Sequence, residues 1–173
     1  MLLAALLVAV PSAAGAKVYM TQEEALRVAF PAAVQVERKT LYLSEADAQK
    51  IGKEAGSPLN GRVFSYYVGK KDSAIVGYAY FDSHIVRTLP EAIMVLVQPD
   101  GRIGRIEILS FAEPEDYFPR DAWRQQFVGK GLDPDLALRR GIRGLTGASL
   151  TAEAITAACR RVLALHHFAG TRP

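Results

Sequence analysis

Two apolar segments joined by a tight turn constrain the fold of this chain more than any other feature. The first, residues 91–98 (EAIMVLVQ), is almost continuously apolar, which predicts a central strand. Pro99-Asp100-Gly101 follows it and is typical of a hairpin turn. The returning segment alternates as Arg105-Ile106-Glu107-Ile108, so one face is expected on a core and the other in water. The sequence therefore predicts an antiparallel sheet.

Helical patterns flank this block of strands. Thr21-Gln22-Glu23-Glu24 is a capping box, which predicts a helix that runs to about Phe30, and Ser44 is expected to cap a second over about 45–55. From Thr151 onward the apolar residues fall on one side of a long amphipathic helix. Further strands are expected over 34–43, 62–69, 74–86 and 103–110.

Composition limits the class of protein. The chain has 173 residues, of which 50% are hydrophobic, and a formal net charge of +3. It is long enough to bury a substantial core, and no repeat or linker divides it, so we expect one α+β domain: a largely antiparallel sheet with helices packed against it. The basic residues are scattered rather than arranged in a stripe with aromatics, so no nucleic-acid partner is expected. His84, His166 and His167 show no metal-ligand spacing, so no metal is expected.

The first sixteen residues differ from the rest. Residues 1–16 (MLLAALLVAVPSAAGA) carry no charge and end in an A-x-A-like site before Lys17, which predicts a signal peptide cleaved after Ala16 and a mature domain over 17–173. The apolar run is shorter than the roughly 20 residues that a spanning helix needs. The only cysteine, Cys159, is expected to be a buried apolar residue inside the last helix.

A turn of small and hydroxyl residues precedes that helix. The segment 146–151 (TGASLT) offers two interpretations. A serine or threonine before a helix commonly caps its backbone donors. The same free donors lie at the positive end of the helix dipole and attract phosphate, and Arg143 or Arg140 is close enough in sequence to pair with one.

Five segments in order resemble a known family. They are Gly77-Tyr78-Ala79-Tyr80-Phe81, the strand pair EAIMVLVQPDGRIGRIEIL, Glu113-Pro114, Trp123-Arg124-Gln125-Gln126-Phe127, and TGASLT before a helix. Together they resemble the FMN-binding domain family over about residues 77–165. That family includes the flavin-carrying subunits of the sodium-pumping NADH:quinone oxidoreductase and of the Rnf electron-transport complex.

The resemblance implies a specific site. In the family a flavin transferase attaches FMN through its phosphate to the last hydroxyl of an Asp-x-x-Ser/Thr-Gly-Ala-Thr/Ser pattern, which corresponds here to Ser149. Arg143 stands in place of the family's aspartate, and Pro114-Glu115-Asp116-Tyr117 in place of its usual run after the glutamate. Both covalent and non-covalent attachment are consistent with these residues. The expected cofactor-binding residues are Thr146, Gly147, Ala148, Ser149, Leu150, Thr151, Arg143, Glu113 and Tyr117.

A flavin ring also needs an apolar or aromatic surface, here called the wall, to pack against. Tyr117, Phe118, Trp123 and Phe127 lie on the irregular segment that could supply one, although core packing is the simpler expectation for most of them.

The expected function follows from the resemblance. It implies an exported electron carrier, in the periplasm or on the outer face of the cytoplasmic membrane, with no organic substrate of its own. Its implied partners are membrane or periplasmic redox proteins: cytochromes, quinone-linked complexes or iron–sulfur proteins. Two alternatives remain open: a sensory or docking module with non-covalent or no flavin, and an extracytoplasmic flavin reductase.

Overall fold

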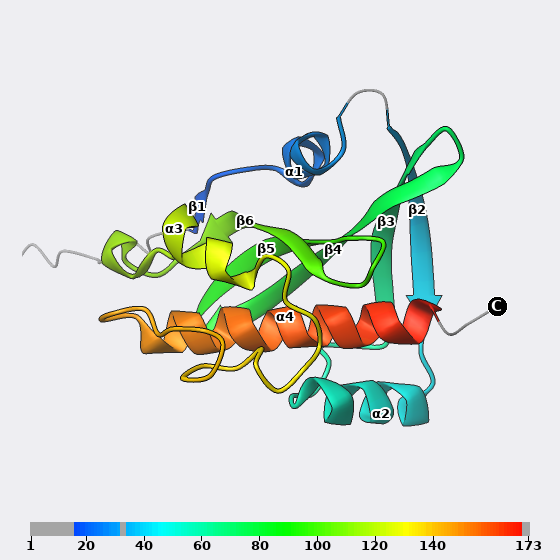
Figure 1. Ribbon diagram of the computed structural model, residues 1–173. Helices are drawn as coiled ribbons and strands as arrows, with labels where there is room; N and C mark the ends of the chain where they lie inside the picture. Colours follow the sequence, from blue (N-terminus) through cyan, green and yellow to red (C-terminus); the bar gives the residue numbers. More distant parts are fainter. Residues whose placement is uncertain (1–15, 32–33, 171–173) are drawn as a thin grey trace, which may run out of the picture.

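The computed structural model describes residues 16–31 and 34–170. Residues 1–15 of the predicted signal peptide lie outside this range, so that prediction stays open. Within the described residues the chain forms one α+β domain, as expected: a six-stranded antiparallel sheet with four helices packed against it (Figure 1).

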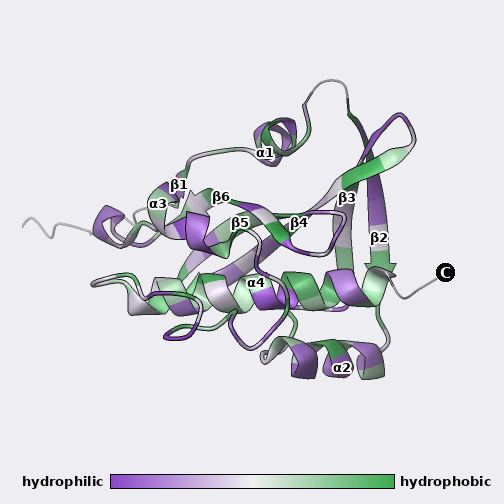
Figure 2. Cartoon of the chain, viewed as in Figure 1, coloured by the Kyte–Doolittle hydropathy of each residue, from purple (hydrophilic) through white to green (hydrophobic). Residues whose placement is uncertain are grey.

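Adjacent strands of the sheet follow the order β1-β6-β5-β4-β3-β2. The strands are β1 (Lys17–Val18), β2 (Gln35–Tyr42), β3 (Val63–Lys71), β4 (Ala74–Val86), β5 (Leu89–Val97) and β6 (Ile103–Phe111). The predicted hairpin is confirmed: β5 pairs with β6 around Gly101, whose φ is +80°. β5 lies inside the sheet, as its apolar sequence predicted, whereas the edge strand β2 is largely hydrophilic (Figure 2).

Both predicted N-terminal helices lie close to their expected bounds, and the capping box predicted at Thr21 and the cap predicted at Ser44 are confirmed. The N-terminal helices are α1 (Gln22–Ala29) and α2 (Glu45–Ala55). Thr21 and Glu24 cap α1 reciprocally, and Ser44 and Asp47 do the same for α2. After β6 come the short turns η1 (Glu115–Tyr117) and η2 (Gln125–Phe127) with the one-turn helix α3 (Asp121–Arg124) between them.

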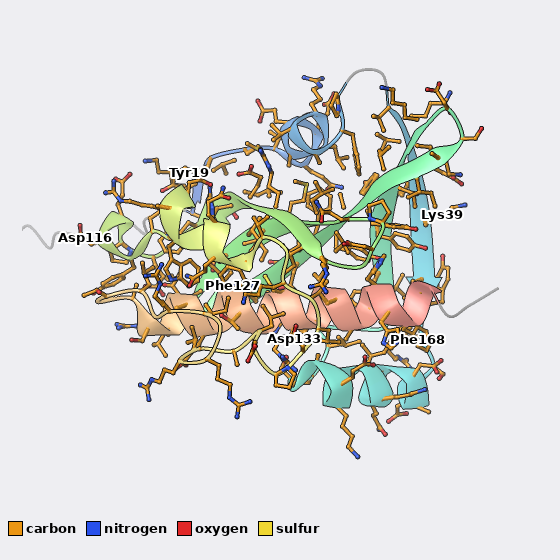
Figure 3. All side chains as sticks on the ribbon, in the orientation of Figure 1. Tyr19, Lys39, Asp116, Phe127, Asp133 and Phe168 are labelled. Carbon is orange, nitrogen blue, oxygen red and sulfur yellow. The ribbon has the colours of Figure 1, made fainter. Side chains whose placement is uncertain are left out.

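The long helix α4 (Ser149–Gly170) lies across one face of the sheet, and α1 covers part of the other (Figure 1). α2 packs against α4, and its residues Ile51 and Ala55 share a buried cluster with Leu41 of β2 and Leu165 of α4. The main core lies between α4 and the sheet, and includes Ile93, Val95, Ile155 and Cys159. The predicted burial of Cys159 is confirmed. Phe168 belongs to the smaller cluster that joins the C-terminal half of α4 to α2 (Figure 3).

Candidate functional site

The helix α4 begins two residues earlier than the sequence predicted. The Ala152 N–H donates to the carbonyl of Ala148 at 3.1 Å, so Ser149 is the first helical residue and Ala148 occupies the capping position. The reason is the turn at Gly147, whose φ of +76° is readily adopted by glycine. The alanine side chain cannot cap a helix, so the simple N-cap interpretation does not account for this turn.

This end of α4 has free hydrogen-bond donors. Within the described part of the chain, the backbone N–H groups of Ser149, Leu150 and Thr151 donate to no protein acceptor. Such groups carry the positive end of the helix dipole. The Ser149 side chain is exposed and makes no hydrogen bond with the described residues, so its hydroxyl is open to solvent.

Six of the nine expected site residues meet at one small hollow, which we call the turn hollow. They come from two segments that are separated in sequence, the loop after β6 and the start of α4. Residues at the end of β4 complete the lining of the hollow. Its lining consists of Val86, Arg87, Glu113, Tyr117, Gly147, Ala148, Leu150 and Thr151. Its volume is only about 10 Å³, which is room for a single water molecule.

Arg87 is the functional candidate that sequence reasoning missed. It sits at the tip of the β4–β5 hairpin with φ of +52°, a left-handed conformation that two-residue hairpin turns require. Its guanidinium lies 5.6 Å from the centre of the Tyr117 ring. A surface arginine at a hairpin tip has no sequence pattern that marks it as part of a site 60 residues further along the chain.

Glu113 contributes a carboxylate that the fold leaves partly unsatisfied. Its Oε1 atom is shielded from solvent and has no hydrogen-bond partner within the described residues. A buried acceptor of this kind costs free energy unless a donor reaches it. The turn hollow beside it has room for a bound water or a ligand N–H.

The remaining three expected residues do not line the turn hollow. Thr146 and Ser149 are exposed and adjoin it along the chain. Arg143, four residues before Gly147, is fixed by hydrogen bonds to its backbone. Trp123 Nε1 donates to its carbonyl at 2.8 Å, and its N–H donates to Gln126 Oε1 at 2.7 Å. Arg87, rather than Arg143, is therefore the arginine that the fold brings to this hollow.

The expected aromatic wall is largely part of the core. Phe127 is fully buried between the sheet and α4 (Figure 3), and Phe118 and Trp123 pack against the same cluster. Tyr117 also contacts this cluster, and it is the one member of the group that lines the turn hollow.

A larger hollow, the α4 groove, adjoins the turn hollow and shares Val86, Arg87 and Leu150 with it. It has a volume of about 350 Å³ and lies between the end of β4 and one side of α4. Its lining consists of His84, Ile85, Val86, Arg87, Leu150, Glu153, Ala154, Ala157 and Arg161.

A buried charge cluster borders this groove. Arg161 binds Asp82 through two hydrogen bonds of 2.8 and 3.1 Å, and His84 bridges Asp82 Oδ1 at 2.9 Å and Glu91 Oε2 at 3.0 Å. Burial alone would lower the pKa of His84, but its hydrogen bonds to Asp82 and Glu91 outweigh burial and raise that pKa. Burial raises the pKa of Glu91, whereas for Asp82 the bonds to His84 and Arg161 overcome burial and lower the pKa.

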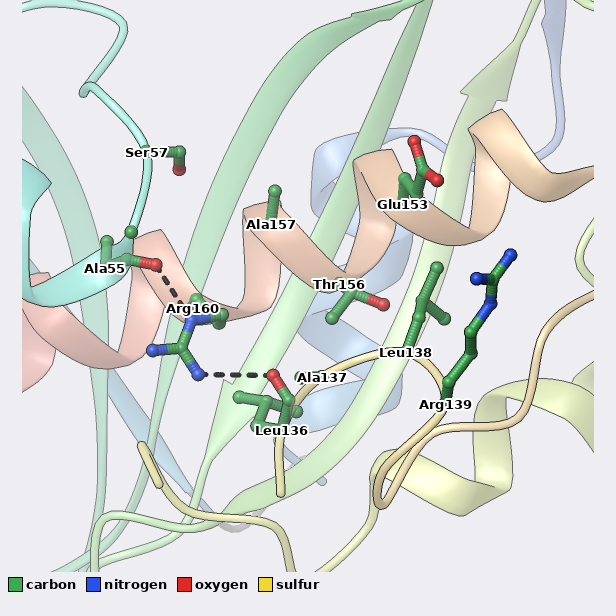
Figure 4. A pocket seen from close by; sticks show the side chains of 11 residues that line it. Ala55, Ser57, Leu136, Ala137, Leu138, Arg139, Glu153, Thr156, Ala157 and Arg160 are labelled. Atoms are coloured by element: carbon green, nitrogen blue, oxygen red, sulfur yellow. Dashed lines mark hydrogen bonds between the residues drawn. The ribbon is translucent and has the colours of Figure 1, made fainter. Parts of the chain in front are cut away.

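A third hollow, the α2 groove, has a volume of about 410 Å³ and lies between α4, the end of α2 and the 136–139 loop (Figure 4). It is on the other side of the residues of α4 that line the α4 groove. It shares Glu153 and Ala157 with the α4 groove. Arg160 crosses it and donates to the carbonyls of Ala55 at 2.8 Å and Leu136 at 3.2 Å. These bonds tie the C-terminus of α2 and the 136–139 loop to α4, which gives Arg160 a structural role.

Comparison with models of known protein families and with curated proteins finds no match to this chain. Among the residues described by the structure, no cluster of three or more His, Cys, Asp or Glu side chains could hold a metal ion. The helices in that part of the chain also include none that is both long and apolar enough to cross a membrane.

Proposed function

We propose that this chain is an FMN-binding electron-transfer protein in which the Ser149 hydroxyl carries the flavin phosphate. One observation carries the proposal: Glu113 and Tyr117 meet the 147–151 turn at a single hollow beside the free end of α4. These are the segments that resemble the FMN-binding domain family, and nothing in their sequence spacing requires them to meet.

The chemistry of this end of α4 suits a phosphate. Three free backbone N–H groups and the helix dipole favour an anion, and Arg87 adds a full positive charge on the facing side. The turn hollow is too small for a phosphate group, so the phosphate would lie at its mouth, beside the exposed Ser149 hydroxyl. Open space in front of Gly147 leaves this approach clear.

Covalent attachment requires an activated flavin donor and a transferase. Ser149 Oγ would form a bond to the flavin-side phosphorus of a flavin dinucleotide, the diphosphate bond would break, and AMP would leave. The hydroxyl proton would pass to a base of the transferase. An exposed hydroxyl on the first turn of a helix is accessible to such an enzyme.

FMN supplies the redox chemistry when bound, while the protein binds and orients it. Arg87 and the α4 amides would hold the phosphate, and the grooves beside α4 would shield part of the cofactor from water. We propose an exported carrier that exchanges electrons with membrane or periplasmic redox proteins, in keeping with the predicted signal peptide.

The intact mass and visible spectrum of the protein from its native host test this proposal. We expect a flavin absorbance and a mass increase equal to FMN less one water, both retained after denaturation and both lost in Ser149→Ala. The control Thr40→Ala changes an exposed hydroxyl on β2 and should keep the adduct. Flavin released by denaturation would restrict the proposal to non-covalent binding, and a colourless protein of unmodified mass would refute it.

A further inference from the structure

The phosphate site leaves open where the flavin ring would lie. Phe127 is fully buried, and Phe118 and Trp123 are partly buried against the same core, so only part of the expected aromatic surface remains free for a ring. A flavin ring therefore needs a further surface within reach of Ser149. The α4 groove begins at Leu150, the next residue along the helix.

The size of the α4 groove is sufficient for a flat, three-ring system. Ala154 and Ala157 leave space along the helix, while Ile85 and Leu150 stand beside it with 60% and 43% of their surface exposed. The stripe from Leu150 to Arg161 extends about 16 Å along α4 at about 1.5 Å per residue. The volume of about 350 Å³ falls within the range of small-molecule sites.

The polar groups of the groove also match the two sides of a flavin. Leu150 and Ile85 offer apolar contacts near the turn, suited to the hydrocarbon part of the ring. Glu153 can accept a hydrogen bond from the ring N–H, and Arg87 lies at the end shared with the phosphate site. The size, apolar exposure and charge of the groove are all compatible with a flavin ring.

We propose that the α4 groove is the seat of the flavin ring, with the ribityl phosphate chain leading from Ser149 past Leu150 into it. This inference rests on the proposed function. The α2 groove is slightly larger, but it joins the α4 groove only at Glu153 and Ala157, beyond the first turn of the helix. The α4 groove shares Val86, Arg87 and Leu150 with the turn hollow, whereas the α2 groove shares no lining residue with it.

A groove-filling variant tests the proposal. Ala154→Phe places a ring in the groove, and the matched control Ala46→Phe adds the same side chain to an exposed position on α2. With FMN loaded, we expect Ala154→Phe to release the ring into water, so that flavin fluorescence rises several-fold and its anisotropy falls. The control should resemble the wild type. Circular dichroism checks that both variants are folded.

Nuclear magnetic resonance of the wild type provides a test that needs no variant. The His84 side chain lines the groove, so its ring signals should shift on FMN loading, whereas those of the exposed His167 should not. Unchanged His84 signals, or equal anisotropy in Ala154→Phe and wild type, would overturn the ring seat while the mass adduct still supports FMN binding. Absence of flavin from every form would refute both proposals.

Discussion

His84 is held between two carboxylates inside the protein, and its protonation should control stability near neutral pH. Because both ring nitrogens lie within 3.0 Å of an acid oxygen, the charged imidazolium can donate to Asp82 and Glu91 at once. The folded pKa of His84 is raised, so its contribution is fully present below the unfolded value near 6.5 and is lost as pH rises through the folded pKa. Glu91, whose pKa is also raised, acts in the same direction.

We therefore expect the free energy of unfolding of the wild type to fall as pH rises from 6 to 9. His84→Gln should cost roughly 2–3 kcal/mol at pH 6, the scale of hydrogen bonds to charged groups, and less at pH 9. Urea titrations across this range measure the difference. The control His167→Gln alters an exposed pair with Glu54 and should change stability little. An equal loss for His84→Gln at both pH values would contradict the assignment.

At the scale of elements, Phe30, the residue that ends α1, makes a close contact with the sheet. Gly69 on β3 pairs with Gly77 on β4, and the Phe30 ring lies over this pair of glycines. A Cβ added at Gly69 would lie 2.4 Å from two atoms of that ring, so any side chain there must push the ring away. The fold needs glycine at this position for close approach rather than for a turn.

Gly69→Ala should consequently destabilise the protein by about 1–3 kcal/mol, the usual cost of overpacking a core. Thermal and urea unfolding measure this loss. Gly144→Ala, where a Cβ meets no atom within 4 Å, is the matched control and should be nearly neutral. Adding Phe30→Leu to Gly69→Ala should recover part of the loss if the clash is its cause. Additive losses in the double variant would point to another cause.

For the whole molecule, local patterns predicted the elements well, but they did not predict how the residues of the candidate site come together. The capping box at Thr21, the cap at Ser44 and the hairpin at Gly101 depend on neighbouring residues, so the sequence displays them directly. The start of α4 was not predicted in this way. The left-handed turn at Gly147 lets the helix begin at Ser149, two residues before the predicted start at Thr151.

The rest of the site depends on contacts between distant segments. The β4–β5 hairpin places Arg87 beside the start of α4. No periodic pattern in the sequence predicts that these two segments lie together. The same is true of the cluster formed by Asp82, His84, Glu91 and Arg161, which joins two strands to a helix. Resemblance identified the turn, but only the fold shows which arginine faces it.

The labelling rate of the single thiol of this chain can measure how often the fold opens. Cys159 has no exposed surface, lies between α4 and the sheet, and has its pKa raised by burial. A thiol reagent can therefore reach it only when α4 separates from the sheet, and the labelling rate reports how often this happens. We expect slow labelling in the native protein and fast labelling of an Ala46→Cys control. Rapid native labelling at Cys159 would mean that α4, and the site at its first turn, separates readily from the sheet.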